Sequence, residues 1–124
     1  MQSFKLVNKA NELYDYSFTY ILNKMPNKAK TFRISLETEL YELIHNIYRA
    51  NINYDSDKIR NKYQKEALVN LSALDLIIGL IGKYKYVKIK RVRGFLGILN
   101  DTKKMMYGWI KEQWLIYFLK YMLI

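Results

Sequence analysis

Residues 83–111 have the sequence KYKYVKIKRVRGFLGILNDTKKMMYGWIK. The first eleven residues of this segment include six basic side chains and no acidic one. After them, large apolar residues recur at three- and four-residue steps, which is the spacing of one face of an α-helix: Val92, Phe95, Leu99, Met106, Trp109 and Ile110. The segment therefore predicts a long amphipathic helix whose apolar side packs into a protein core.

A second face of the same helix is cationic. Lys90, Lys104 and Lys111 are separated by multiples of seven residues, so they share one side of the helix, with Arg93 beside them. Lysines on a helix are in most proteins only a solvated surface, and an AT-rich genome can enrich lysine without a functional cause. Here, however, the whole chain has the same bias, with 21 Lys and Arg against 11 Asp and Glu and a formal charge of +10.

An excess of positive charge in a small domain attracts polyanions and raises the rate of encounter with them. We therefore predict contact with RNA or DNA through basic residues of the segment 83–111 and of the segment 57–67. The predicted nucleic-acid-binding residues are Lys83, Lys85, Lys88, Lys90, Arg91, Arg93, Lys104 and Lys111, together with Lys58, Arg60, Lys62 and Lys65.

Length and composition predict one globular domain. The chain has 124 residues, 51% of them hydrophobic, which suffices for a single core but not for two. Without cysteine it forms neither disulfides nor thiolate zinc sites, and we expect a cytoplasmic protein. The first residues lack the apolar core of a signal peptide, and no run approaches the ~20 apolar residues of a membrane-spanning helix.

Apolar periodicity divides the chain into four helices, expected at about residues 3–25, 31–53, 57–81 and 88–118. Pro26 ends the first helix, because the residue before a proline is disfavoured in helical geometry. Four amphipathic helices joined by short turns predict an all-α protein, an up-down-up-down antiparallel four-helix bundle. Gly82 is expected to cap the third helix at its C-terminus.

Two segments are more apolar than one bundle core requires. Residues 68–81, LVNLSALDLIIGLI, are apolar on nearly every side of a helix, which favours a subunit interface. Residues 113–124 form an apolar C-terminal tail with one charge, Lys120, and are expected to pack on a neighbouring subunit, on another partner, or at a membrane interface. The predicted oligomer interface comprises Leu68, Leu71, Leu76, Ile77, Leu80, Ile81 and Trp114.

Residues with catalytic chemistry are scarce. The chain has one histidine, His45, no cysteine and no glycine-rich phosphate loop. The acidic sequence Tyr54–Lys58 lacks the ligand number and the glycine of a calcium loop, so Ser56 or Asp57 is expected to cap the third helix instead. We therefore expect a protein that is not an enzyme, with no cofactor, metal or small-molecule substrate.

Short signatures occur near the helix ends. The most specific is Met105-Met106-Tyr107-Gly108-Trp109-Ile110, and the others are Met25-Pro26, Ala50-Asn51, Tyr54-Asp55-Ser56-Asp57-Lys58 and Leu99-Asn100-Asp101. Over residues 4–112 the chain resembles the Avd-like four-helix bundles, the accessory variability determinants of diversity-generating retroelements. Those proteins are related to bundles encoded in intervening sequences of 23S ribosomal RNA genes. Tyr107, the basic residues 83–93 and the apolar tail depart from that family's pattern.

The resemblance implies a ring-shaped homopentamer with a basic surface that binds a reverse transcriptase and nucleic acid. Such a protein supports mutagenic copying of a template RNA and its retrohoming into a variable gene. The alternative is a structural homo-oligomeric bundle that associates with a membrane surface through its apolar tail. A reverse-transcriptase gene beside this gene would favour the first function.

Overall fold

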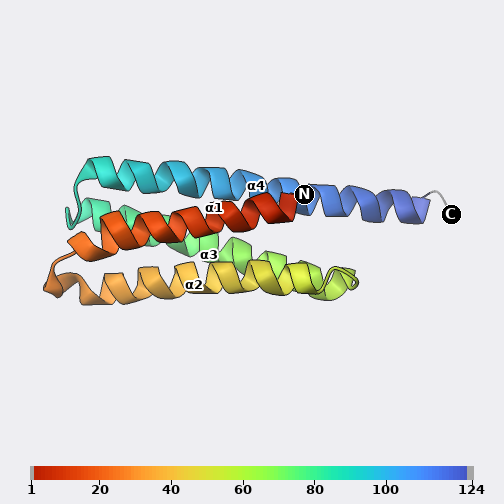
Figure 1. Cartoon of the computed structure of the whole chain (residues 1–124), viewed down its shortest axis with the longest axis horizontal. Coiled ribbons are helices and arrows are strands. Elements are labelled where there is room, and N and C mark those ends of the chain that lie inside the picture. Colours follow the sequence, from red (N-terminus) through yellow and green to blue (C-terminus); the bar gives the residue numbers. More distant parts are fainter. Residues whose placement is uncertain (1, 123–124) are drawn as a thin grey trace.

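The computed structural model describes residues 2–122 and confirms the predicted all-α bundle (Figure 1). Its four long helices are α1 (Gln2–Tyr16), α2 (Lys30–Ile52), α3 (Asp57–Lys83) and α4 (Ile89–Met122). Each helix packs against its neighbours in the order α1, α2, α3, α4 and back to α1. The turn between α1 and α2 and the turn between α3 and α4 therefore lie at one end of the bundle, and α2 joins α3 at the other.

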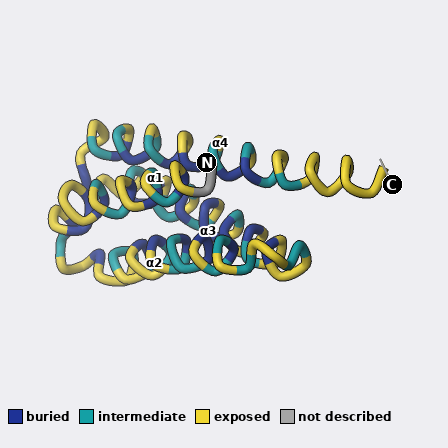
Figure 2. The backbone as a smooth tube through the Cα atoms, turned by 45° about the vertical axis from the view of Figure 1, so that its right-hand side comes forward, coloured by how far each residue is buried: buried dark blue, intermediate teal, exposed yellow. Residues whose placement is uncertain are grey.

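One core runs along the bundle axis, as the dark segments of Figure 2 show. The apolar face of residues 92–109 lies in it: Val92, Phe95, Leu99, Met106 and Trp109 are all buried. Phe95 is the largest of the fully buried side chains. Two asparagines cross the core between α2 and α3, where the Asn46 amide donates to Asn70 at 2.8 Å and the Asn70 amide donates to Glu39 at 2.8 Å. These bonds satisfy polar groups that would otherwise be costly to bury.

The first predicted helix, residues 3–25, changes geometry partway along its length. After Tyr16 the chain forms a π-helical segment, Ser17–Ile21, and then a 3₁₀ turn, Leu22–Lys24. The buried Ser17 hydroxyl donates to the Leu13 carbonyl at 2.7 Å and so competes with the backbone ladder. Pro26 follows an extended Met25, as proline geometry requires. A second 3₁₀ turn, Asn27–Ala29, leads into α2.

The connection from α3 to α4 differs from the sequence expectation. Gly82 is not the cap, because α3 continues to Lys83 and the left-handed residue is Lys85, with φ of 57°. The Lys85 amide donates to the Gly82 carbonyl and the Tyr86 amide to the Ile81 carbonyl, both at 3.1 Å. These are the two bonds of a Schellman motif, in which glycine is the usual left-handed residue. A lysine there is strained.

Replacing Lys85 with glycine is expected to raise the free energy of unfolding. The left-handed conformation costs a side-chain-bearing residue about 1–2 kcal/mol, and glycine's extra freedom in the unfolded chain offsets about 0.5–1 kcal/mol of that gain. Urea denaturation should therefore show a gain of about 0.5–1 kcal/mol for Lys85→Gly. Lys85→Ala is the matched control, since it removes the charge and keeps the strain. Equal stability of the two variants would contradict strain at this position.

The other end of α3 and the end of α4 complete the fold. Ser56 is the N-cap of α3, and its hydroxyl accepts the Ile59 amide at 3.3 Å. α4 extends past the expected residue 118 to Met122, so the tail is a continuation of this helix, and its last two residues lie outside the described part. Within residues 2–122, no helix is both long and apolar enough to span a membrane.

Candidate nucleic-acid interface

The fold collects the excess positive charge of the chain at one end. Residues 16–36 and 76–100 meet there, and they contain ten Lys and Arg and no Asp or Glu. The rest of the chain contains eleven residues of each sign, so this end accounts for the whole formal charge of +10. We name it the cationic end and define it by Lys24, Lys28, Lys30, Arg33, Lys83, Lys85, Lys88, Lys90, Arg91 and Arg93.

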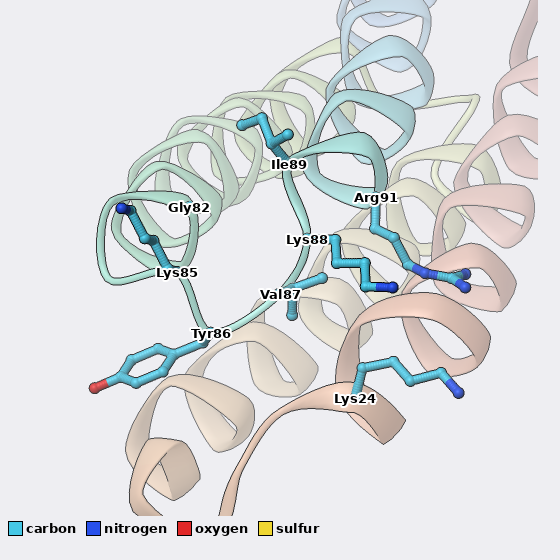
Figure 3. Close-up of a pocket in the computed structure, with 8 residues that line it drawn as sticks. All are labelled: Lys24, Gly82, Lys85, Tyr86, Val87, Lys88, Ile89 and Arg91. Atoms are coloured by element: carbon cyan, nitrogen blue, oxygen red, sulfur yellow. The ribbon is translucent and has the colours of Figure 1, made fainter.

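The centre of the cationic end is a hollow of about 780 Å³ between the end of the first helical segment and the α3–α4 connection. Lys24 contributes from the first segment, while Lys85, Lys88 and Arg91 contribute from the connection and the first turn of α4. In Figure 3 the side chains of Lys24, Lys88 and Arg91 extend to the same side of the connection. Among residues 4–122, none of the ten basic side chains is in an ion pair.

Basic side chains surround the N-terminus of α4, where the helix dipole disfavours positive charge. The N-terminus of a helix carries a partial positive charge, which acidic side chains stabilise and basic ones oppose. The first turn of α4 contains no acid, and Lys88, Lys90 and Arg91 surround it. Each such cation costs about 0.3–1 kcal/mol at an exposed terminus. The basic residues at this terminus therefore lower stability, and a bound anion would offset that cost.

Tyrosines are interleaved with these cations. The Arg91 guanidinium lies 4.6 Å from the Tyr20 ring centroid. The Lys28 ammonium lies 6.0 Å from the Tyr86 ring, which also contacts Tyr84 at a centroid distance of 5.8 Å. Tyr20 and Tyr84 are exposed. Exposed aromatic rings beside a cationic groove are the surface on which unpaired bases stack.

Tyr16 fixes the start of α4 beneath this surface. Its hydroxyl donates to the Arg91 carbonyl at 2.8 Å. Burial raises the Tyr16 pKa above the usual value of a tyrosine, and the nearby Arg91 charge opposes that rise. The neutral phenol therefore remains a donor at physiological pH. Gly94 makes this contact possible, because a Cβ at that position would overlap the Tyr16 hydroxyl.

The remaining predicted nucleic-acid residues lie elsewhere. Lys104 and Lys111 are exposed on α4 but belong to the half of the bundle in which charges balance. At ~1.5 Å per residue, Lys111 lies ~30 Å along the helix from Lys90. Lys58, Lys62 and Lys65 are exposed on the first half of α3, also away from the cationic end. The predicted cationic face of α4 is thus divided between two regions.

The prediction that Arg60 binds nucleic acid is wrong. The residue is buried, with a relative exposure of 6%. The guanidinium donates to the Tyr54 carbonyl at 2.6 Å and pairs with the Asp57 carboxylate. Tyr54 lies in the turn before α3, and Asp57 is the first residue of α3. Arg60 therefore stabilises that turn. It is not available to a phosphate.

The predicted oligomer interface also needs correction. Leu71 and Ile81 are buried in the bundle core, so they cannot contact another subunit. Leu68, Ile77 and Leu80 are half-buried, whereas Leu76 and Trp114 are exposed. The outward face of α3 instead carries an apolar row at alternating four- and three-residue steps, which we name the α3 seam: Val69, Ala73, Leu76 and Leu80. Sequence periodicity missed Val69 and Ala73, because a segment that is apolar all round does not reveal which side faces the core.

Residues with catalytic or metal-binding chemistry do not gather anywhere in the described chain. His45 contacts Tyr41 and Arg49 within α2, at 3.3 and 3.4 Å. No group of three or more His, Cys, Asp or Glu in residues 2–122 has the geometry to hold a metal ion. The cationic end is therefore the strongest candidate site on the described surface.

Comparison of the chain with protein-family models, with curated proteins and with solved structures finds no match.

Proposed function

We propose that this protein is a non-enzymatic accessory protein that binds RNA or DNA through its cationic end. The observation that carries the proposal is the location of the charge: ten basic residues with no acid at one end of a bundle that is otherwise neutral. Solubility alone does not require such segregation, since a dispersed excess of charge serves it equally well. A segregated excess produces a strong local field that concentrates polyanions.

The chemistry of the surface favours the nucleic-acid backbone over particular base sequences. Lysine and arginine side chains neutralise phosphates, while Tyr20 and Tyr84 offer exposed rings to unpaired bases. No described helix has the arrangement of a base-reading module, because the cations surround turns and helix ends rather than one groove-sized face. Binding is therefore strong at low salt and nearly independent of sequence.

The biological context of the proposal comes from the resemblance to the Avd-like bundles. We propose that the partner protein is the reverse transcriptase of a diversity-generating retroelement and that the nucleic acid is its template RNA or the DNA copy. Such a complex acts in the cytoplasm during mutagenic retrohoming. Co-purification of the reverse transcriptase encoded beside this gene tests the partner. Failure of the two proteins to associate would remove this context and leave the nucleic-acid proposal standing.

Self-association is part of the same proposal. The α3 seam has the alternating three- and four-residue spacing of a helix that packs on another helix, and Val69 and Leu76 expose about two thirds of their surface (67% and 65%). We propose that copies associate through it, with five copies on the basis of the resemblance. Repetition of the cationic end on each copy would strengthen binding through avidity.

Salt dependence tests the nucleic-acid proposal directly. Each phosphate contact lowers the logarithm of affinity by about 0.9 per tenfold rise in salt on duplexes. With ~6 contacts, affinity for a structured RNA should fall on the order of a thousandfold between about 50 and 200 mM salt. Fluorescence anisotropy measures this slope, and two RNAs of unrelated sequence serve as the specificity control. A slope near zero would contradict phosphate binding.

A further inference from the structure

The C-terminal part of α4 leaves the bundle. Figure 1 shows α4 continuing past the first residue of α1, and Figure 2 shows that its outer turns are exposed on every side. We name residues 113–122 the projecting helix. Its large apolar side chains are between 42% and 66% exposed: Trp114, Leu115, Ile116, Tyr117, Phe118, Leu119, Tyr121 and Met122.

The projecting helix leaves a large apolar surface in water. Because it continues the already formed α4, the cost lies in this exposed surface and not in helix nucleation. Four aromatic side chains, each about half exposed, present on the order of 400 Å² of surface, and the four aliphatic ones bring the total to roughly the 800 Å² that each partner contributes to a stable interface. The projecting helix therefore has the size and chemistry of half an interface.

A groove lies at the base of the projecting helix, between the start of α1, the end of α2 and α4. It has a volume of about 660 Å³, and Phe4, Tyr48, Tyr54 and Trp109 line it. Phe4, Tyr48 and Tyr54 are exposed. The groove thus offers apolar side chains to an incoming helix.

A second groove adjoins the first, since Arg60 and Gln113 line both. It has a volume of about 370 Å³ between the first half of α3 and the projecting helix, and Gln64, Trp114 and Tyr117 are among its lining residues. Gln64 is 1% exposed, yet neither atom of its side-chain amide has a hydrogen-bond partner. Buried amides are nearly always paired. Gln64 is thus an exception among residues 4–122.

We infer that the occupant of this end is a second copy of the chain, whose projecting helix lies antiparallel to the first. One two-fold axis places each projecting helix against the other and directs it toward the grooves at the other's base, so a single arrangement covers the apolar helix and the apolar grooves on both copies.

Charge fixes the register of the pair. Glu112 lies at the base of the projecting helix next to Lys111, and Lys120 lies near its other end. Glu112 and Lys120 both lie four residues from Ile116 and on its side of the helix. When the two-fold axis passes beside Ile116, Glu112 of each copy stands at the level of Lys120 of the other. The antiparallel direction therefore pairs opposite charges, whereas a parallel pair would bring like charges together.

This contact is independent of the proposed function. It uses neither the cationic end nor the α3 seam, and its test requires no nucleic acid. If RNA binding fails, the pairing of projecting helices can still be observed, and the converse also holds.

Cysteine chemistry gives a sharp test, because the native chain has no cysteine. Ile116→Cys is expected to form a disulfide-linked dimer under mild oxidation at micromolar concentration, since the two sulfurs meet near the axis. Tyr107→Cys, exposed on the same helix but within the bundle, is the matched control and should link at least tenfold more slowly. Equal rates for the two variants would overturn the inference.

Charge reversal tests the register in the otherwise native chain. Glu112→Lys is expected to weaken self-association of the full-length protein severalfold in sedimentation equilibrium, and Glu112→Lys with Lys120→Glu should restore it. Failure of the double variant to restore association would overturn the proposed pairing. Loss of binding to anionic phospholipid vesicles on Ile116→Glu, with no change in solution mass, would assign the projecting helix to a membrane surface instead.

Discussion

Reversing four lysines of the cationic end is expected to reduce affinity for RNA on the order of a thousandfold at about 100 mM salt. At that concentration each phosphate contact contributes a factor of about eight relative to 1 M salt, and four contacts multiply. The variant is Lys24→Glu, Lys85→Glu, Lys88→Glu and Lys90→Glu. The bundle should remain folded, because all four side chains are exposed and glutamate at the start of α4 agrees with the helix dipole.

The control variant changes the charge equally in the neutral half of the bundle. Lys58→Glu, Lys62→Glu, Lys65→Glu and Lys104→Glu lower the formal charge from +10 to +2, as the first set does. These residues are exposed and lie away from the cationic end. Affinity measured by anisotropy should fall far less for this variant, and circular dichroism verifies the helix content of both. Equal losses would show that RNA responds to net charge and not to one site.

A single substitution in the α3 seam is expected to dissociate the oligomer that packs through it. Leu76→Glu places a carboxylate at the middle of an apolar contact, where desolvation and like-charge repulsion oppose association. A cost of about 3 kcal/mol corresponds to roughly a hundredfold weaker association, and light scattering at micromolar concentration should show the smaller mass.

Asn11→Glu provides the control for that substitution. Asn11 is exposed on α1, which packs on α2 and α4 and lies across the bundle from α3. Its substitution should leave the mass unchanged. If Leu76→Glu retains the native mass, copies do not associate through the α3 seam.

The sequence was sufficient for the fold because apolar periodicity is a local property. The apolar residues between Val92 and Trp109 that recur at helical spacing share one face of α4, and that face is buried. Periodicity does not indicate the sides of a segment that is apolar all round. Periodicity alone therefore predicts that Leu71 and Ile81 lie in a subunit interface, although both are buried in the core. It also omits Val69, which is exposed.

The sequence predicted only part of the candidate site. The run of cations from Lys83 to Arg93 is local, so the sequence reveals it. Lys24, Lys28, Lys30 and Arg33 join that run only because the α1–α2 connection and the start of α2 pack beside the α3–α4 connection. The prediction for Arg60 is wrong for a related reason. Its burial depends on the Tyr54 carbonyl and the Asp57 carboxylate, which come together only in the folded turn. Long-range proximity and turn geometry are the properties that residue spacing does not encode.

Two energetically unfavourable features lie at the cationic end. Lys85 occupies a left-handed conformation in which glycine is favoured, and the cations at the start of α4 oppose its dipole. Both features lower stability, and both increase the density of positive charge around the central hollow. This agreement supports a functional role for the cationic end.

The site at which RNA contacts the protein can be located by cross-linking. Ultraviolet cross-linking of a structured RNA to the native protein, followed by mass spectrometry of the peptides, identifies the residues in contact. If RNA binds at the cationic end, adducts are expected on the peptides that contain Tyr20, Tyr84 or Tyr86, which lie among the cations. Adducts confined to Tyr54, Tyr107 or Tyr117, with none at the cationic end, would contradict binding at that end.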